Sequence, residues 1–229
     1  MKKLIAFLLL AAVLTAGCNK KDSVTYSGIE AGTLGSGVFT SDIGTRMYVV
    51  SNESNLDVSR SRRAVIQYET HPITDPNHLE IDLISLLDAI IREPAPAEAL
   101  DNNPAGSPIE VADAWFSGGY LNLLVGSEGK DYDKHLCSAA YMVNNDGIVI
   151  RLLHQNDEGK TSAANSPLKA FLSLPMDELQ QAYEQHAKST GKKQLFPVTV
   201  TLQWTSTTLD GGSLTLNERK GSYSPAAAN

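Results

Sequence analysis

The sequence has 229 residues, of which 42% are hydrophobic and 20% are charged, and its formal net charge is −7. This acidic balance argues against non-specific nucleic-acid binding, which needs a basic surface, and we expect no nucleic-acid partner. The length allows one large domain or two small ones.

The N-terminus predicts a secretory signal peptide over residues 1–17. Two lysines are followed by an unbroken apolar run from Leu4 to Leu14 and by the small residues Thr15, Ala16 and Gly17. This run is shorter than the roughly 20 apolar residues of a membrane span. The segment Leu-Thr-Ala-Gly-Cys looks like a lipobox, so we expect acylation at Cys18. The alternative is an ordinary signal peptide followed by a coincidental cysteine.

Acylation of Cys18 would anchor the mature chain to a membrane. Fatty acyl chains such as palmitate contribute about 0.8 kcal/mol per buried CH₂, so two or more chains give durable anchoring. Residues 18–30 are rich in Ser, Gly, Thr and Lys and predict a flexible tether. Only Cys137 would then remain as a thiol, and the body must be stabilised by packing without an internal disulfide. Removal of the signal peptide would take away Lys2 and Lys3. The mature chain would then have 17 basic and 26 acidic residues, for a net charge of about −9.

Residues 31–93 predict a small OB-like β-barrel. Short β-forming runs occur around Phe39, at 47–50, at 64–68 and at 79–83, with a polar loop at 51–63. In the last run Leu79, Ile81 and Leu83 alternate with acidic residues, which is typical of a half-buried strand. The stretch 84–91 fits either a helix or a closing strand. Closure of these short strands into a barrel would remove exposed edges.

Residues 94–108 contain four prolines and predict a linker, because proline removes backbone donors. Residues 109–222 predict an antiparallel β-sandwich with one inserted helix, followed by a disordered tail at 223–229. Gly118-Gly119 and Asp146-Gly147 mark tight hairpin turns. Val198, Val200, Leu202 and Trp204 alternate with polar residues. The helix, over 176–188, follows Pro175 and has acidic residues in its first turn.

The segment Val-Ala-Asp-Ala-Trp115-Phe-Ser-Gly-Gly-Tyr120-Leu-Asn resembles the NigD-like lipoproteins of the Bacteroidetes. The later strand at 147–153 and the strand ending in Trp204 extend the resemblance, which covers nearly the whole mature chain. It implies an N-terminal OB-like domain and a C-terminal β-sandwich domain, but no established biochemical activity. One departure is the helix at 176–188, which is longer than expected between those strands.

The expected location is the outer membrane, with a lipid anchor and the body facing the periplasm. Acidic residues just after the cysteine favour surface display in lipoproteins of the Bacteroidetes, whereas this tether begins Asn19-Lys20-Lys21. Display on the cell surface is the alternative.

The clearest cluster of reactive residue types is His135, Cys137 and His154. These could form a zinc site or a Cys–His nucleophilic pair, but no paired ligand motif and no helix N-terminus supports either. A half-buried cysteine with surface histidines is the simpler interpretation. The loop between His71 and His78 could hold a cation, although a polar, proline-rich loop is the more ordinary explanation. The carboxylate pairs Asp131/Asp133 and Asp157/Glu158 fit solvated turns.

Trp115, Tyr120 and Trp204 are the candidate binding residues. Aromatic side chains of a β-sandwich usually fill its core, and the alternative is a partly exposed platform for a sugar or protein.

The sequence therefore predicts a membrane-anchored lipoprotein of the bacterial cell envelope. We expect a non-catalytic binding or scaffold module for a protein or glycan partner, without a metal or other cofactor. The first alternative is a metal-binding or accessory hydrolytic protein using His135, Cys137 and His154. The second is an immunity-like, bacteriocin-associated envelope protein, which rests on the family name alone.

Overall fold

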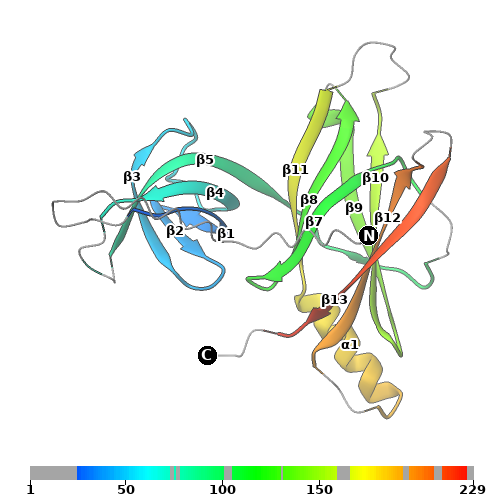
Figure 1. Cartoon of the computed structure of the whole chain (residues 1–229). Coiled ribbons are helices and arrows are strands. Elements are labelled where there is room, and N and C mark those ends of the chain that lie inside the picture. The colour runs from blue at the N-terminus through cyan, green and yellow to red at the C-terminus, as the bar shows by residue number, and fades with distance from the viewer. Residues whose placement is uncertain are drawn as a thin grey trace, which may run out of the picture. The chain divides into compact units, whose positions relative to one another are not determined.

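The computed structural model describes residues 25–72, 75, 78–100, 105–129, 131–158, 166–192, 196–208 and 213–225. The chain is mainly β, as the sequence predicts, and its contacts divide it into unit 1 (Met1–Ala89) and unit 2 (Ile90–Asn229). Figure 1 shows the elements of both units. The predicted signal peptide and Cys18 lie outside the described residues. No helix within the described ranges is long and apolar enough to cross a membrane.

Unit 1 is built from five strands. They are β1 (Ser27–Gly35), β2 (Val38–Ser41), β3 (Arg46–Asn52), β4 (Arg62–Thr70) and β5 (Leu79–Ile91). The strand order is β3-β2-β1-β4-β5, and β3 also pairs with β5 in parallel, so the backbone pairings form a closed ring. The stretch 84–91 is a strand, because Ser85 to Asp88 pair with residues of β4.

Strand β1 begins at Ser27, inside the stretch 18–30 that the sequence predicts as a tether. Its three glycines, Gly28, Gly32 and Gly35, have low β-propensity, and the pairing with β4 from Ser27 to Leu34 compensates for this. Leu34 at its end is fully buried. Long-range pairing therefore overrides a composition that is typical of a flexible segment.

The core of unit 1 is made of alternate residues of its strands. The residues that form it are Leu34, Phe39, Met47, Ala64, Ile66, Tyr68, Ile81 and Leu83. Burying a large apolar side chain contributes about 1.5–3 kcal/mol, so this cluster supplies most of the unit's stability. A buried ion pair lies next to it, in which Nη1 and Nη2 of Arg63 donate to the two carboxylate oxygens of Asp42 at 2.8 and 2.7 Å.

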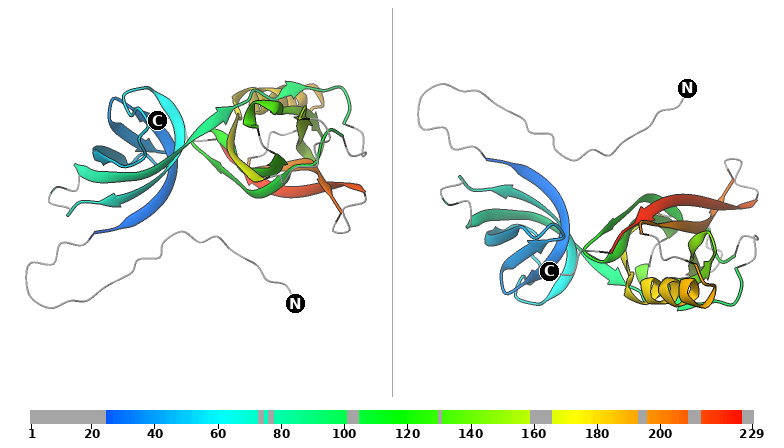
Figure 2. Two further views of the ribbon diagram at one scale, coloured as in Figure 1. Left: turned by 90° about the horizontal axis from the view of Figure 1, so that it is seen from above. Right: turned by 90° about the horizontal axis from the view of Figure 1, so that it is seen from below.

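Unit 2 contains two β-sheets. One has the order β11-β8-β7, with β7 (Glu110–Ser117), β8 (Tyr120–Gly129) and β11 (Ser166–Pro175). The other has the order β13-β12-β10-β9-β6, with β6 (Ala95–Pro96), β9 (His135–Asn144), β10 (Gly147–Asn156), β12 (Val198–Thr207) and β13 (Leu214–Tyr223). A short 3₁₀ helix, η1 (Tyr132–Lys134), precedes β9. Figure 2 shows the two sheets of unit 2 as separate layers.

The core of unit 2 lies between these sheets. Leu121, Leu123 and Leu172 come from one sheet, and Ile150 and Leu202 come from the other. Both predicted hairpins are confirmed, since Ser117 pairs with Tyr120 and Asn144 pairs with Gly147.

The predicted helix is confirmed as α1 (Asp177–Ser189); Leu179 and Ala187 are buried, and Leu179 belongs to the core of unit 2. The chain passes from β10 through β11 and α1 before it returns as β12. This long connection allows β12 to pair with β10 in parallel, so the sheet is not purely antiparallel as predicted. Apolar alternation is the same in parallel and antiparallel strands, and it therefore could not reveal the direction.

The stretch predicted as a linker, 94–108, is bonded to unit 2 in its described part. Ala95 and Pro96 form β6 beside β9, and Ala97 N donates to Tyr141 O at 2.8 Å. Ala105 N donates to Thr205 Oγ1 at 3.0 Å. Proline in a two-residue edge strand is tolerated because no further strand needs its missing donor. Similarly, Tyr223 of the predicted tail belongs to β13 and is buried.

Candidate functional site

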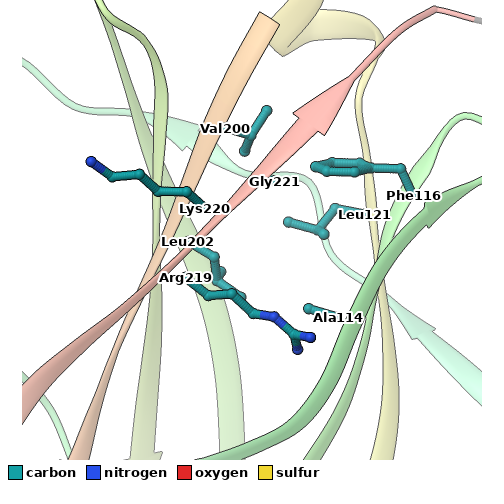
Figure 3. A pocket seen from close by; sticks show the side chains of 8 residues that line it. All are labelled: Ala114, Phe116, Leu121, Val200, Leu202, Arg219, Lys220 and Gly221. Carbon is teal, nitrogen blue, oxygen red and sulfur yellow. The ribbon is translucent and has the colours of Figure 1, made fainter. Parts of the chain in front are cut away.

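The candidate site is a cleft in unit 2 between the edge strands of its two sheets. Among the described strands, β7 pairs only with β8, and β13 pairs only with β12. The cleft between them has a volume of about 90 Å³. Its lining is mainly apolar and includes the buried core residues Leu121, Val200 and Leu202 (Figure 3).

The sequence of β13 explains why a cleft remains at this edge. Gly221 pairs with Val200 and Arg219 pairs with Leu202. Residues directly opposite in an antiparallel pair project on the same face, so Gly221 and Arg219 occupy inward positions of β13. Neither residue supplies an apolar side chain to cover Val200 and Leu202. An inward charged residue on an edge strand also discourages pairing with another chain.

Phe116 forms one wall of the cleft. Its ring lies 5.4 Å from the ring of Tyr223, measured between centroids, with the planes tilted by 50°. A Cβ atom at Gly221 would lie only 3.0 Å from Cε2 of Phe116, so the missing side chain at Gly221 allows the ring to approach β13. Burial, with a smaller effect of Asp177, raises the pKa of Tyr223 above its ordinary value.

The mouth of the cleft carries an ion pair between the two edge strands. Nη1 of Arg219 lies 3.3 Å from Oδ1 of Asp113, and their side chains are 50% and 34% exposed. Asp113 follows a β-bulge in β7, and its Oδ1 also accepts a hydrogen bond from the Ala114 N–H at 2.8 Å. A solvent-exposed pair of this kind contributes about 0–1 kcal/mol, so it can exchange partners at low cost.

The structure does not bring the three predicted aromatic residues together. Trp115 stacks in parallel on Phe171 at 5.8 Å and donates through Nε1 to Ser117 Oγ at 3.1 Å. Trp204 is half-buried against the core of unit 2, and Tyr120 is also half-buried. The neighbouring Phe116, together with the pair Arg219 and Gly221, lines the cleft instead. The sequence signal that could have revealed the cleft is Gly221 and Arg219, a glycine and a charged residue at positions of β13 that face the core.

The predicted cluster of His135, Cys137 and His154 is partly confirmed as a spatial cluster. His154 Nδ1 lies 2.9 Å from the Pro108 carbonyl oxygen, which can only accept, so this nitrogen carries the proton. His154 Nε2 must then accept from Nδ1 of His135, which lies 3.1 Å away. Cys137 is paired across the strands with His154.

Glu158 completes this cluster and was missed by the sequence analysis, which treated it as a solvated carboxylate. Its Oε1 lies 3.2 Å from Nε2 of His135, and both side chains are at least nine-tenths buried. Among the described residues, Nε2 of His135 has no hydrogen-bond partner, so this contact is a close approach and not a hydrogen bond. The same oxygen accepts from the Asp131 N–H at 2.6 Å. Glu158 therefore lies against His135, whose ring stacks on that of His154 at 5.2 Å between centroids.

The chemistry of this cluster favours a structural role. Burial, partly offset by Arg92, raises the pKa of the Cys137 thiol above its ordinary value, so the reactive thiolate is disfavoured. No three His, Cys, Asp or Glu side chains in the described ranges converge in a way that could hold a metal ion. In the other histidine loop, His71 Nε2 contacts Asp82 Oδ1 at 2.9 Å, and His78 Nε2 lies 3.4 Å from Glu80 Oε1.

We expect the buried His154 to make unit 2 less stable in mild acid. Burial is the main reason that the pKa of His154 lies below its ordinary value of 6.5. The unfolded chain therefore takes up this proton first as the pH falls below about 6.5, and unit 2 loses stability by at most about 1.4 kcal/mol per pH unit. Trp115 and Trp204 are the only tryptophans and both lie in unit 2, so tryptophan fluorescence reports its thermal unfolding.

The matched variant for this prediction is His154→Gln, in which an amide replaces the imidazole. Its melting temperature should fall less steeply than that of the wild type between pH 7.5 and 5.5. Equal slopes for the two proteins would show that other groups control the acid sensitivity.

Solved structures with a similar fold come from the Bacteroidetes. A NigD-like immunity protein from Bacteroides caccae is 18% identical, with a TM-score of 0.62 over 86% of this chain and 97% of that chain. A protein of unknown function from Bacteroides vulgatus is 14% identical, with a TM-score of 0.60 over 88% and 93%. A candidate lipoprotein from Bacteroides fragilis is also 14% identical, with a TM-score of 0.60 over 88% and 100%.

No protein-family model and no curated protein matches the sequence. The structural likeness extends over nearly the whole length of each chain, and it confirms the predicted NigD-like fold.

Proposed function

We propose that this chain, which has the fold of the NigD-like structures, is a non-catalytic binding protein of the bacterial cell envelope. It is anchored through acylated Cys18 and holds an envelope component in the cleft between β7 and β13. The observation that carries the proposal is the apolar lining of this cleft, to which the core residues Val200 and Leu202 and the ring of Phe116 contribute. Clefts with apolar walls and a few polar groups are the usual form of a ligand site.

The lining favours a ligand that carries an apolar group. Burying sugar hydroxyls against Leu121, Val200 and Leu202 would leave their hydrogen bonds unsatisfied, at a cost of about 1–3 kcal/mol each. Of the protein and glycan partners expected from the sequence, the cleft therefore suits the apolar groups of a protein better. The immunity-like role is a second candidate, supported by the name of the Bacteroides caccae protein.

The anchor is tested with the two cysteines of the chain. Cells that express the Cys18→Ser variant should fail to label it with an alkyne analogue of palmitate, because the acylated sulfur is missing. The variant should also move from the membrane pellet to the soluble fraction. The matched control is Cys137→Ser, which should label and pellet like the wild type. Membrane association of Cys18→Ser at the wild-type level would contradict lipid anchoring.

The binding site is tested by filling the cleft. Gly221→Val places a side chain against Phe116, whereas Gly126→Val is a matched control on β8, where the nearest atom to a new Cβ is 3.7 Å away. Tagged chains are recovered from gently solubilised envelopes, and the retained components are compared by mass spectrometry. We expect at least one component that is retained by the wild type and Gly126→Val but lost from Gly221→Val. Identical retention by all three proteins would contradict the proposal.

A further inference from the structure

We infer that the cleft between β7 and β13 binds an aliphatic carboxylic acid, with the apolar chain between the sheets and the carboxylate on Arg219. This inference rests on the proposed binding function and names the chemical class of its ligand. It follows from three features of unit 2, namely the apolar lining, the cation at the mouth, and the acidic residue that holds this cation.

The apolar part of the ligand is selected by the inner lining. Leu121, Val200 and Leu202 belong to the hydrophobic core, and their side chains are at most 3% exposed. Phe116 adds an aromatic face, and its ring lies close to the backbone of β13 at Gly221. An alkyl chain placed here removes its own surface from water, which contributes about 0.8 kcal/mol per CH₂.

The charged part of the ligand is selected by Arg219. Its guanidinium points toward the strand that bears Ala114, across the mouth of the cleft, whereas the side chain of Lys220 points away (Figure 3). A guanidinium presents a planar set of donors that fits a carboxylate with two parallel hydrogen bonds. An anionic head group therefore finds its counter-ion at the point where the apolar chain leaves the cleft.

Asp113 already places one carboxylate oxygen against the guanidinium, with its Oδ1 at 3.3 Å from Nη1 of Arg219. It also makes the site competitive, since a bound carboxylate has to displace or share this contact. The pair is exposed, and exchange of one carboxylate for another costs little. Replacing Arg219 should consequently weaken carboxylate binding, whereas replacing Asp113 should strengthen it. A general loss of stability would not produce these opposite effects.

The experiment is calorimetric titration of the mature soluble chain with sodium octanoate and, separately, with 1-octanol, which has the same chain length without the charge. We expect octanoate to bind about tenfold more tightly than octanol, as one charge-assisted hydrogen-bonded pair predicts. Arg219→Gln should remove this preference, whereas Asp113→Asn should tighten octanoate binding about threefold. Gly221→Val should abolish binding of both compounds.

The control for net charge is Arg60→Gln, whose side chain is 81% exposed in unit 1 and which should bind octanoate like the wild type. Equal affinity for octanoate and octanol, or weaker octanoate binding by Asp113→Asn, would overturn the assignment. If octanoate fails to bind while envelope components are still lost from Gly221→Val, the ligand class is wrong and the binding function stands. If Gly221→Val changes neither measurement, both proposals fail.

Discussion

Replacing Asp42 with asparagine is expected to destabilise unit 1 by about 3–5 kcal/mol, because it leaves the buried guanidinium of Arg63 without the opposite charge of this pair. The two side chains are only 9% and 4% exposed and meet through two hydrogen bonds of 2.7 and 2.8 Å. Hydrogen exchange followed by mass spectrometry should show much faster exchange in peptides from β1 and β4. The tryptophan fluorescence of unit 2 provides an internal reference.

The matched control is Asp88→Asn, which removes a carboxylate from the pair that Asp88 forms with Arg62. Their atoms are 2.9 Å apart, but Asp88 is 52% exposed. Exposed pairs contribute about 0–1 kcal/mol, so exchange in β4 should change little. Equal effects of the two substitutions would show that burial does not determine the contribution of the Arg63–Asp42 pair.

The substitution Gly147→Ala is expected to destabilise unit 2 by about 3 kcal/mol or more. Gly147 has a φ of +140°, which an alanine rarely adopts, and a Cβ there would lie 2.1 Å from the carbonyl oxygen of Thr199. This oxygen belongs to the backbone of β12, in the sheet beside β10, and it cannot move without disturbing the strand pairing. Thermal unfolding followed by tryptophan fluorescence measures the effect.

Gly119→Ala separates backbone strain from this steric overlap. Gly119 also has a positive φ, of +81°, but nothing lies within 4 Å of the position that a Cβ would take there. The cost should be about 1–2 kcal/mol, which is the strain of a left-handed residue alone. If the two glycines cost the same, the close approach of β12 to Gly147 contributes nothing to stability.

Local patterns predicted much of the fold. The hairpins at Gly118-Gly119 and Asp146-Gly147 follow from the need for positive φ, and the helix α1 follows from its acidic first turn and the apolar stripe around Leu179. These features depend on residues that are neighbours in the sequence. The segment around Trp115 correctly indicated the NigD-like fold.

Features that depend on distant parts of the chain were not predictable in this way. The strand β1 acquires its structure from β4, about 35 residues later, and the parallel pairing of β10 with β12 depends on the path of the connection between them. The buried pair of Asp42 and Arg63 joins a turn to a strand, and each residue alone is typical of an exposed surface.

The candidate site was likewise only partly predictable from local sequence patterns. Phe116 lies beside Trp115 in the segment that was singled out, but alternation along β7 places the two rings on different faces, and only Phe116 enters the cleft. The cleft itself depends on which residues of β13 lie opposite Val200 and Leu202. That register is set by tertiary packing, so Arg219 and Gly221 gained their significance only from the structure.

The most direct test of binding at the cleft is ¹⁹F NMR of the mature chain labelled with 4-fluorophenylalanine. Its four phenylalanines are Phe39, Phe116, Phe171 and Phe196, and Phe116→Leu identifies the resonance from the cleft. The labelled chain is titrated with the eluate recovered from the wild-type chain. We predict that the Phe116 resonance shifts while those of the fully buried Phe39 and Phe171 stay in place. A stationary Phe116 resonance, with any other resonance shifted, would contradict binding in the cleft.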